Sequence, residues 1–79
     1  MSFTVQYVAY LREAAGRSVE TRDARAATAA ELYDEVAAAH GFRWSRAAMS
    51  VAVNGRVQPW TVRLQPGDEI LFLPPASGG

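Results

Sequence analysis

The segment TAAELYDEVAAAHG (28–41) constrains the fold most, because it is the clearest amphipathic helix in a chain of 79 residues. Thr28 and Glu31 have the spacing of a capping box, in which each side chain accepts a hydrogen bond from a free backbone N–H near the helix start. The side chains of one buried helical face follow at the expected spacing: Ala29, Leu32, Tyr33, Val36 and His40. Gly41 is placed to end the helix in a left-handed conformation. A chain this short forms one small domain, so this helix belongs to a single core.

The segments before the helix have the composition of β-strands. FTVQYVAY (3–10) is rich in β-branched and aromatic residues and predicts a first strand. Alternation places two sets of side chains on opposite faces of that strand: Phe3, Val5, Tyr7 and Ala9 on one, and Thr4, Gln6, Val8 and Tyr10 on the other. LREAAG (11–16) predicts a short helical turn that ends at Gly16, and SVETRD (18–23) predicts a weaker second strand.

The segments after the helix predict further strands. SVAVNGRVQ (50–58) indicates two short strands around Asn54-Gly55, because this dipeptide is the strongest short hairpin signal. LQPGDEILFLP (64–74) indicates a turn at Pro66-Gly67 followed by a final strand. Pro74 closes that strand, since proline has no N–H to donate to a sheet ladder.

One helix across one mixed sheet is the natural two-layer solution for this order of elements. We therefore predict an α+β protein with a β-grasp arrangement, in which the first and last strands are neighbours at the centre of the sheet. The main helix covers one face of that sheet. We expect a single domain over residues 1–79, with residues 74–79 as a projecting tail.

The composition excludes several classes of chemistry. Eight arginines balance eight acidic residues, and lysine and cysteine are both absent. A formal net charge of zero does not favour a nucleic-acid or anionic-membrane partner. Without cysteine there is no disulfide, thiol nucleophile or thiolate metal site, and without lysine there is no side-chain amine. The first residues lack a secretion signal, and apolar runs stay well below the roughly 18 residues of a membrane span. We expect a cytoplasmic protein.

No constellation of side chains predicts a catalytic site. His40 is the only histidine, and its position at a helix C-terminus indicates a dipole or capping role. Neighbouring residues point in different directions, so neither adjacent acid pair predicts a carboxylate dyad or a metal site: Asp34-Glu35 and Asp68-Glu69. We interpret Trp44 and Trp60, in loop-like segments, as lids over the core.

The last strand carries an anomaly. In EILFLPP (69–75) Ile70 and Phe72 share one face, and two leucines share the other. A single helix covers only one side of a sheet, so the second face is left open, and exposed apolar patches mark partner surfaces. We predict a docking surface on that face: Val8, Tyr10, Val57, Leu71 and Leu73. The alternative is a strand buried on both faces.

The chain resembles a known family when four features are taken together: the strand order, VAVNG (51–55), LQPGDEILFLPP (64–75) and the terminal SGG. It resembles the small subunit of molybdopterin synthase, a ubiquitin-like β-grasp sulfur carrier, over essentially its whole length. YLREAAG (10–16) is similar to the family's "LRE…G" segment, and GDEILFLPPASGG (67–79), ending the sequence, is the most specific match.

Other relatives keep alternatives open. Sulfur carriers for thiamine share the fold and the terminal glycines, but they are usually shorter and lack the proline pair. Further relatives donate sulfur for cysteine synthesis or tRNA thiolation. Two other classes of function stay open beside the sulfur carriers. A protein modifier of ubiquitin type shares the activation chemistry, and a plain interaction module would have a tail without a function.

The resemblance implies that the reactive group is the α-carboxyl of Gly79. In this family a ubiquitin-activating-type enzyme uses ATP to adenylate the last glycine. Sulfur transfer then makes a thiocarboxylate, and we expect a sulfurtransferase to take part in that step. The large synthase subunit, in a heterotetramer, uses two such deliveries to turn cyclic pyranopterin monophosphate into the dithiolene of molybdopterin. The carrier itself holds no catalytic side chain, metal or permanent cofactor.

The resemblance also gives roles to other residues of the tail and of the first helical turn. Ser77 and Gly78 are expected to thread into the partner enzymes, because glycine lacks a Cβ and has a thin cross-section. Pro74 and Pro75 are expected to stiffen the tail's root and so reduce the ordering entropy lost on binding. Arg12, in the LRE segment, is expected to add a charged contact to the activating enzyme.

Overall fold

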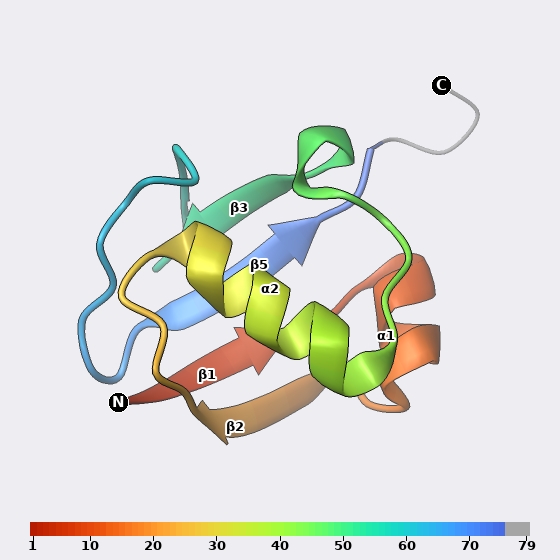
Figure 1. Cartoon of the computed structure of the whole chain (residues 1–79), viewed down its shortest axis with the longest axis horizontal. Helices are drawn as coiled ribbons and strands as arrows, with labels where there is room; N and C mark the ends of the chain where they lie inside the picture. Colours follow the sequence, from red (N-terminus) through yellow and green to blue (C-terminus); the bar gives the residue numbers. More distant parts are fainter. Residues whose placement is uncertain (76–79) are drawn as a thin grey trace.

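The computed structural model describes residues 1–75, so the predictions for Ser77, Gly78 and Gly79 lie outside the described residues. Figure 1 shows the order of elements along the chain. They are β1 (Ser2–Gln6), α1 (Ala9–Ala15), β2 (Val19–Asp23), α2 (Ala29–His40), the 3₁₀ turn η1 (Arg46–Ala48), β3 (Ser50–Val53), β4 (Arg56–Gln58) and β5 (Glu69–Leu73).

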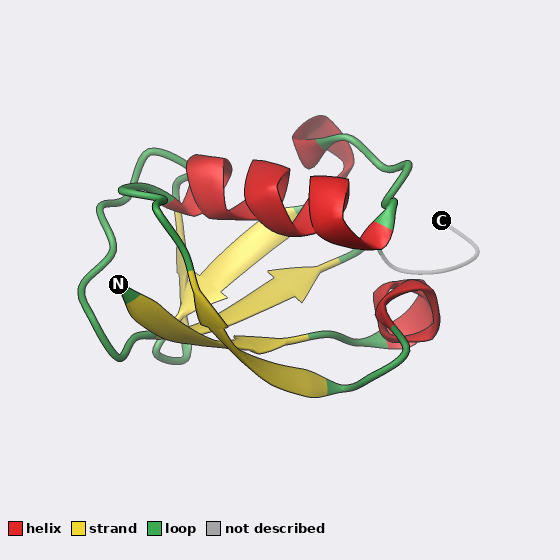
Figure 2. Cartoon of the chain, turned by 60° about the horizontal axis from the view of Figure 1, so that its bottom comes forward, coloured by secondary structure: helices red, strands yellow, loops and turns green. Residues whose placement is uncertain are grey.

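The described strands form one mixed sheet with the order β2-β1-β5-β3-β4. β1 runs parallel to β5 at the centre, and the other three pairs are antiparallel. Figure 2 shows α2 lying across one face of this sheet. This is the β-grasp topology, so the predicted fold class is confirmed, including the central pairing of the first and last strands.

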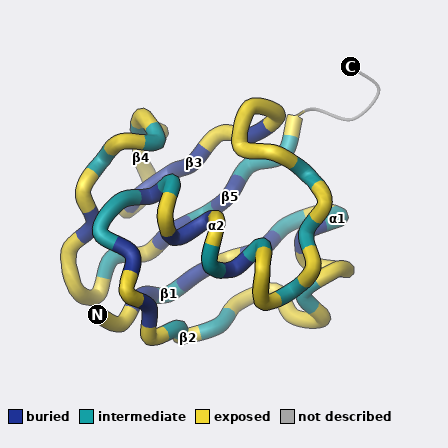
Figure 3. Tube along the Cα trace, viewed as in Figure 1, coloured by how far each residue is buried: buried dark blue, intermediate teal, exposed yellow. Residues whose placement is uncertain are grey.

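The core fills the space between α2 and the sheet (Figure 3). The register pairs Val5 with Ile70 and Val51 with Phe72, which brings alternate residues of three strands to the helix side. These four side chains are fully buried, as are Leu32 and Val36 of α2. Trp44 and Trp60 lie in loops and are partly buried against this core, which confirms their interpretation as lids.

The two ends of α2 follow the predicted local chemistry with one difference. Thr28 Oγ1 accepts a hydrogen bond from the Glu31 N–H at 3.2 Å, as a capping box requires. The Glu31 carboxylate, however, accepts from the Ala27 N–H at 2.7 Å and not from Thr28 itself. The backbone N–H that donates to Glu31 therefore comes from the residue before the one that a capping box uses. Gly41 ends the helix at φ 72°, in the left-handed region.

The first strand is shorter than predicted, because β1 ends at Gln6 and Tyr10 belongs to α1. Ala9 takes φ 51°, a left-handed conformation that costs a residue with a Cβ about 1–2 kcal/mol. This turn starts a helix that buries Leu11 completely, and the burial outweighs the strand propensity of the segment. The predicted strand faces for Ala9 and Tyr10 are therefore wrong, although the alternation still holds at Tyr7 and Val8.

The predicted turns around β5 are confirmed. Asn54 and Gly55 both have positive φ angles, as a two-residue β3–β4 hairpin turn requires. The Asp68 carboxylate accepts from the Gln65 N–H at 2.8 Å and from the Asn54 side-chain amide at 3.0 Å, which joins the turn before β5 to the hairpin. β5 ends at Leu73, directly before Pro74. Within residues 1–75, no helix has the length and hydropathy needed to cross a membrane.

Candidate functional site

The face of the sheet opposite α2 carries the predicted docking surface. Because directly paired residues share a face, the register defines one row across all five strands: Val19, Gln6, Leu71, Ala52 and Val57. Leu71 is half-buried, and Val57 at the β4 edge is 70% exposed. The part of this row that lies on β5, β3 and β4 is therefore apolar, whereas β1 contributes the polar Gln6. A final strand buried on both faces is excluded.

Leu73 lies at the border between this face and the tail. It pairs with Ser50 of β3 and is half-buried, as is Pro74, whereas Pro75 is exposed. η1 ends two residues before Ser50, so the root of the tail leaves the sheet beside η1 (Figure 1). Any protein docked over Leu71 and Leu73 would therefore have the start of the tail at the margin of its contact.

The predicted members of the patch on α1 are placed differently. Val8 is half-buried at the N-cap of α1 and follows the alternation of β1, so it stays with the open face. The Tyr10 ring instead lies against Trp44, with 4.2 Å between ring centroids. Tyr10 therefore packs toward the loop after α2, and the structure does not bring it together with Leu71 and Val57. Arg12 is exposed on α1.

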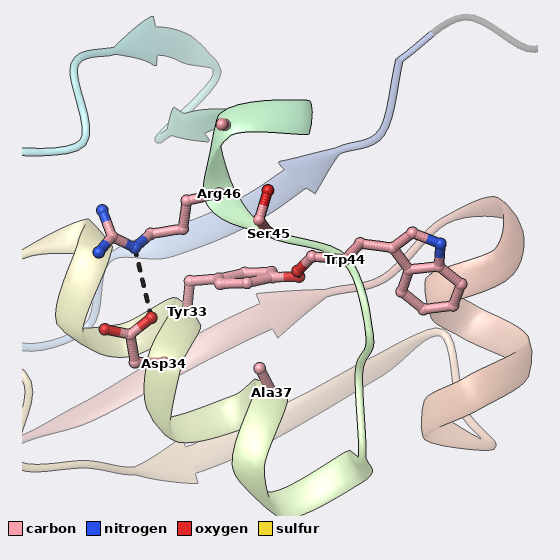
Figure 4. A pocket seen from close by; sticks show the side chains of 7 residues that line it. Tyr33, Asp34, Ala37, Trp44, Ser45 and Arg46 are labelled. Carbon is pink, nitrogen blue, oxygen red and sulfur yellow. Dashed lines mark hydrogen bonds and ion pairs between the residues drawn. The ribbon is translucent and has the colours of Figure 1, made fainter.

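A shallow depression on the helix side was not predicted from the sequence (Figure 4). It has a volume of about 500 Å³ and lies between α2 and the loop that leads into η1. The Tyr33 hydroxyl donates to the Trp44 carbonyl across its floor, and Arg46 Nε contacts Asp34 at 3.3 Å on its rim. It is lined by Tyr33, Asp34, Ala37, Trp44, Ser45, Arg46 and Ala47. Sequence spacing gives no indication of it, because two segments assemble it in space.

A polar cluster lies under the C-terminal end of α2. Val5 pairs with Glu20, which turns this β2 side chain toward the core, and its side chain is only 8% exposed. The Glu20 carboxylate accepts from the Tyr7 hydroxyl and lies 2.9 Å from His40 Nε2. Arg17 and Arg22 approach the same carboxylate at 3.8 and 3.7 Å. His40 thus joins α2 to an edge strand, and its ring contacts a side chain instead of the helix's last carbonyls.

The environment of this cluster shifts two pKa values in opposite directions. Burial alone would raise the pKa of Glu20, but the hydrogen bonds from Tyr7 and His40 and the nearby positive charges outweigh it, so its pKa is lowered. Burial first, and then the hydrogen bond to Glu20, raise the pKa of Tyr7. Both shifts favour the observed arrangement of a neutral phenol donating to an ionised carboxylate. The cluster stabilises the fold and offers no free nucleophile.

In the described residues 1–75, no group of three or more histidine and acidic side chains could hold a metal ion. In the adjacent acid pairs, Asp68 caps a turn and Asp34 pairs with Arg46. The side chains of the described part thus assemble a contact surface and a polar cluster, and Pro74 and Pro75 lead from that surface to the predicted reactive end.

Comparison with known proteins agrees with this fold. The sequence model of the ThiS family matches residues 5–79. The structure is similar to SAMP1 from Haloferax volcanii, with a TM-score of 0.83 and 28% identity over 100% of both chains. It is also similar to a protein from Pyrococcus furiosus assigned as molybdopterin converting factor subunit 1, with a TM-score of 0.80 and 27% identity over 96% of this chain and 99% of that one.

A third likeness concerns the fold alone. Subunit 1 of molybdopterin-converting factor from Helicobacter pylori, solved in complex with subunit 2, has a TM-score of 0.68 and 21% identity over 100% of both chains. No protein with a curated description matches the sequence significantly.

Proposed function

Because the chain belongs to the ThiS family, whose members are small β-grasp sulfur carriers and not catalysts, we propose that it carries sulfur on the α-carboxyl of Gly79. The receiving pathway that we propose is the synthesis of molybdopterin. The likeness to the Pyrococcus furiosus molybdopterin converting factor subunit supports this choice. The alternative with the same chemistry is the delivery of sulfur for thiamine synthesis, cysteine synthesis or tRNA thiolation.

The proposed activation proceeds in two steps. A ubiquitin-activating-type enzyme joins the Gly79 carboxylate to the α-phosphate of ATP, and pyrophosphate leaves. A sulfur donor of the hydrosulfide class then attacks the carbonyl carbon, AMP leaves with the electron pair of the C–O bond, and a thiocarboxylate remains. After the sulfur has joined the substrate in the large synthase subunit, water cleaves the acyl–sulfur bond and restores the carboxylate. The carrier supplies its terminus and its contact surface.

One observation carries this proposal: β5 runs from the open apolar face directly into Pro74 and Pro75. A partner that buries Leu71 and Leu73 removes apolar surface from water, which provides binding free energy next to the root of the tail. The two prolines limit the directions in which the following residues leave that surface. Binding energy from the face is thus coupled to placement of residues 76–79, including Ser77 and Gly78.

We propose that the large synthase subunit and the activating enzyme both use the open face. Val8, Val57, Leu71 and Leu73 form its apolar part, and the exposed Arg12 on α1 lies at its rim. Tyr10, predicted as part of this face, is left out of the proposed surface, because its ring packs against Trp44 in the loop after α2. Arg12 is exposed and positively charged, so it suits an acidic side chain of the activating enzyme.

Deletion of Gly78 and Gly79 tests the reactive terminus. The full chain and the truncated chain are each incubated with an activating enzyme, ATP and a sulfide donor, and their intact masses are measured. We expect the full chain to exchange one oxygen for sulfur and the truncated chain to show no exchange. Thermal unfolding should be nearly the same for both chains, because the deletion leaves the buried core intact. Sulfur transfer by the truncated chain would refute the assignment.

A modifier function is the second candidate, because the likeness to SAMP1, a small archaeal modifier protein, extends over the whole chain. Both functions share the acyl-adenylate. A modifier would transfer the carboxyl to lysine amines of other proteins, whereas a carrier would return to its free acid after delivering sulfur. Trypsin cuts this chain last after Arg63, so target lysines that carry residues 64–79 as a branch, joined through Gly79, would favour the modifier over the carrier.

A further inference from the structure

We propose that this chain places no amine, imidazole or thiol within reach of its own activated C-terminus, so that the activated acyl group is not captured by a nitrogen or sulfur nucleophile of the carrier itself. The inference rests on the proposed function, in which the Gly79 carboxyl becomes an electrophile. It follows from the nucleophiles that the sequence contains and from where the fold places them. The consequence is a carrier that is neither cyclised nor linked into chains with its own copies.

The inventory of nitrogen and sulfur nucleophiles is unusually short. The 79 residues contain no lysine and no cysteine, and all eight basic side chains are arginines. A guanidinium stays protonated in proteins and has no free electron pair for attack at a carbonyl carbon. Two nitrogen nucleophiles remain: the α-amino group of Met1 and the imidazole of His40.

The fold places the Met1 amine beyond the reach of the tail. Thr4 of β1 pairs with Glu69 of β5 in parallel, so Met1 lies at the start of β5 and the tail leaves from its end. At about 3.3 Å per residue of extended strand, Met1 and Pro75 lie roughly 30 Å apart along the strand direction. Four further residues, 76–79, span at most about 14 Å. Figure 1 shows the N-terminus and the end of β5 on opposite sides of the molecule.

The same amine is also held by contacts of its own. It donates to Asp23 Oδ1 at 3.2 Å and to the Ala24 carbonyl at 3.0 Å. An ammonium group in these contacts has to lose a proton and leave both acceptors before it can attack. For the same reason, the Met1 amine of a second copy is hindered from attacking the activated C-terminus of the first.

The His40 ring is shielded by its neighbours. Nε2 lies 2.9 Å from the Glu20 carboxylate, and the side chain is 16% exposed. The rings of Tyr7 and Phe42 lie against it, with centroid distances of 5.5 and 5.7 Å. The Tyr7 hydroxyl donates to Glu20 inside the same cluster and is occupied too. These contacts hold the imidazole away from an incoming acyl group.

Position 46 shows what a reachable acceptor would do. Arg46 is exposed in η1, which ends two residues before Ser50, and Ser50 pairs with Leu73 at the root of the tail. The side chain at this position pairs with Asp34 at 3.3 Å, so a lysine amine there first has to leave that carboxylate. The free amine would then attack the Gly79 carbonyl carbon, the leaving group would depart with the electron pair of the broken bond, and the ammonium proton would go to solvent. The product is a lactam that has lost its reactive terminus. Arginine at this position keeps the positive charge without that reaction.

A chemically defined thioester tests the inference without the pathway's enzymes. The full chain is released from an intein fusion as its C-terminal thioester with 2-mercaptoethanesulfonate and is kept dilute at mildly alkaline pH. Intact mass and peptide mapping follow three forms: the unchanged chain, Arg46→Lys, and Arg63→Lys. Arg63 is a matched control because it is exposed and lies opposite Thr28, at the end of the molecule away from the tail root.

We expect the unchanged chain to hydrolyse to the free acid without a lactam. Arg46→Lys should give at least about tenfold more lactam than Arg63→Lys, because proximity raises the effective concentration of its amine. A Met1–Gly79 or His40–Gly79 linkage in the unchanged chain would overturn the inference, as would equal lactam yields from the two lysine variants. Failure of sulfur transfer with the pathway's enzymes would leave these outcomes unchanged, so the two proposals fail separately.

Discussion

Leu73 is the residue at which the open apolar face meets the start of the tail. It is half-buried on the open face and pairs with Ser50, so a partner that covers it removes the rest of its apolar surface from water. Pro74 follows immediately, which links burial of this one side chain to the direction of the tail. Among the residues of the open face, single substitutions should therefore weaken partner binding most at Leu73 and least at the β2 edge.

Leu73→Asp should weaken binding of the large synthase subunit and of the activating enzyme at least about tenfold. A partner that covers the rest of this half-buried leucine gains part of the roughly 1.5–3 kcal/mol of full burial, and the aspartate adds the cost of removing a carboxylate from water. Calorimetric titration with each partner measures the loss, and circular-dichroism melting checks the fold. Val19→Asp is the matched control, because Val19 is 52% exposed at the far end of the same face. Unchanged affinity in Leu73→Asp refutes the docking surface, and a collapsed melting temperature places Leu73 in the core instead.

At the scale of elements, β2 is held in the sheet by contacts of its charged side chains as well as by its backbone pairing with β1. It is an edge strand whose inward positions carry Glu20 and Arg22, opposite Val5 and Phe3 of β1. Inward-pointing charges on an edge strand discourage further strands from pairing there. His40 and Tyr7 satisfy the Glu20 carboxylate, so the end of α2 and the edge of the sheet depend on one acidic group.

This arrangement predicts a specific loss of stability in acid. The pKa of Glu20 is lowered in the folded state, so its contribution is fully present above the unfolded value of about 4.3 and is lost as pH falls through the folded value. Urea unfolding between neutral pH and pH 3 should therefore show a free energy of unfolding that falls below about pH 4.3.

Two variants isolate the contribution of this carboxyl group. Glu20→Gln should be less stable at neutral pH and should show a shallower fall in acid, because it has no carboxyl group to protonate. Tyr7→Phe removes one hydrogen bond that lowers the Glu20 pKa, so its acid slope should lie between the other two. An acid slope in Glu20→Gln equal to that of the unchanged chain would show that other groups cause the loss.

The sequence predicts the elements well wherever local chemistry determines them. The Thr28 cap, the Gly41 end and the Asn54-Gly55 turn are local features, and all three are confirmed. The end of β1 was not predicted, because it depends on the burial of Leu11 against residues distant in sequence. The inward side of β2 and the depression around Trp44 were missed for the same reason, since partners from other elements create them.

At the scale of the whole molecule, one face of the sheet is occupied by α2 and the other is open, so two large partners cannot dock side by side. The apolar part of the open face is a strip over β5, β3 and β4 that contains Leu71, Ala52 and Val57, and the tail begins at its border. The candidate site was predictable to that extent: alternation places Leu71 and Leu73 correctly, whereas Tyr10 required knowledge of α1. The proposed use of the same strip and tail by both partners predicts that their binding is mutually exclusive.

Competition between the partners should follow from this geometry. With the carrier bound to a labelled large subunit, added activating enzyme should displace it in proportion to concentration, and fluorescence anisotropy measures the displacement. Saturating activating enzyme should leave no ternary complex in size-exclusion chromatography. A stable ternary complex would show that the two enzymes use separate surfaces and would limit the open face to one of them.

The parallel pairing of β1 with β5 has a mechanical consequence. A partner that draws on the tail pulls along the axis of β5, while a tether at Met1 would pull the opposite way along β1. In that geometry the central ladder is loaded in shear, so its hydrogen bonds share the force together and are not opened one after another like a zipper. A central strand tied on both sides, to β1 and to β3, resists such a load better than an edge strand would. The strand that precedes the tail is thus also the strand that tension along the tail displaces least.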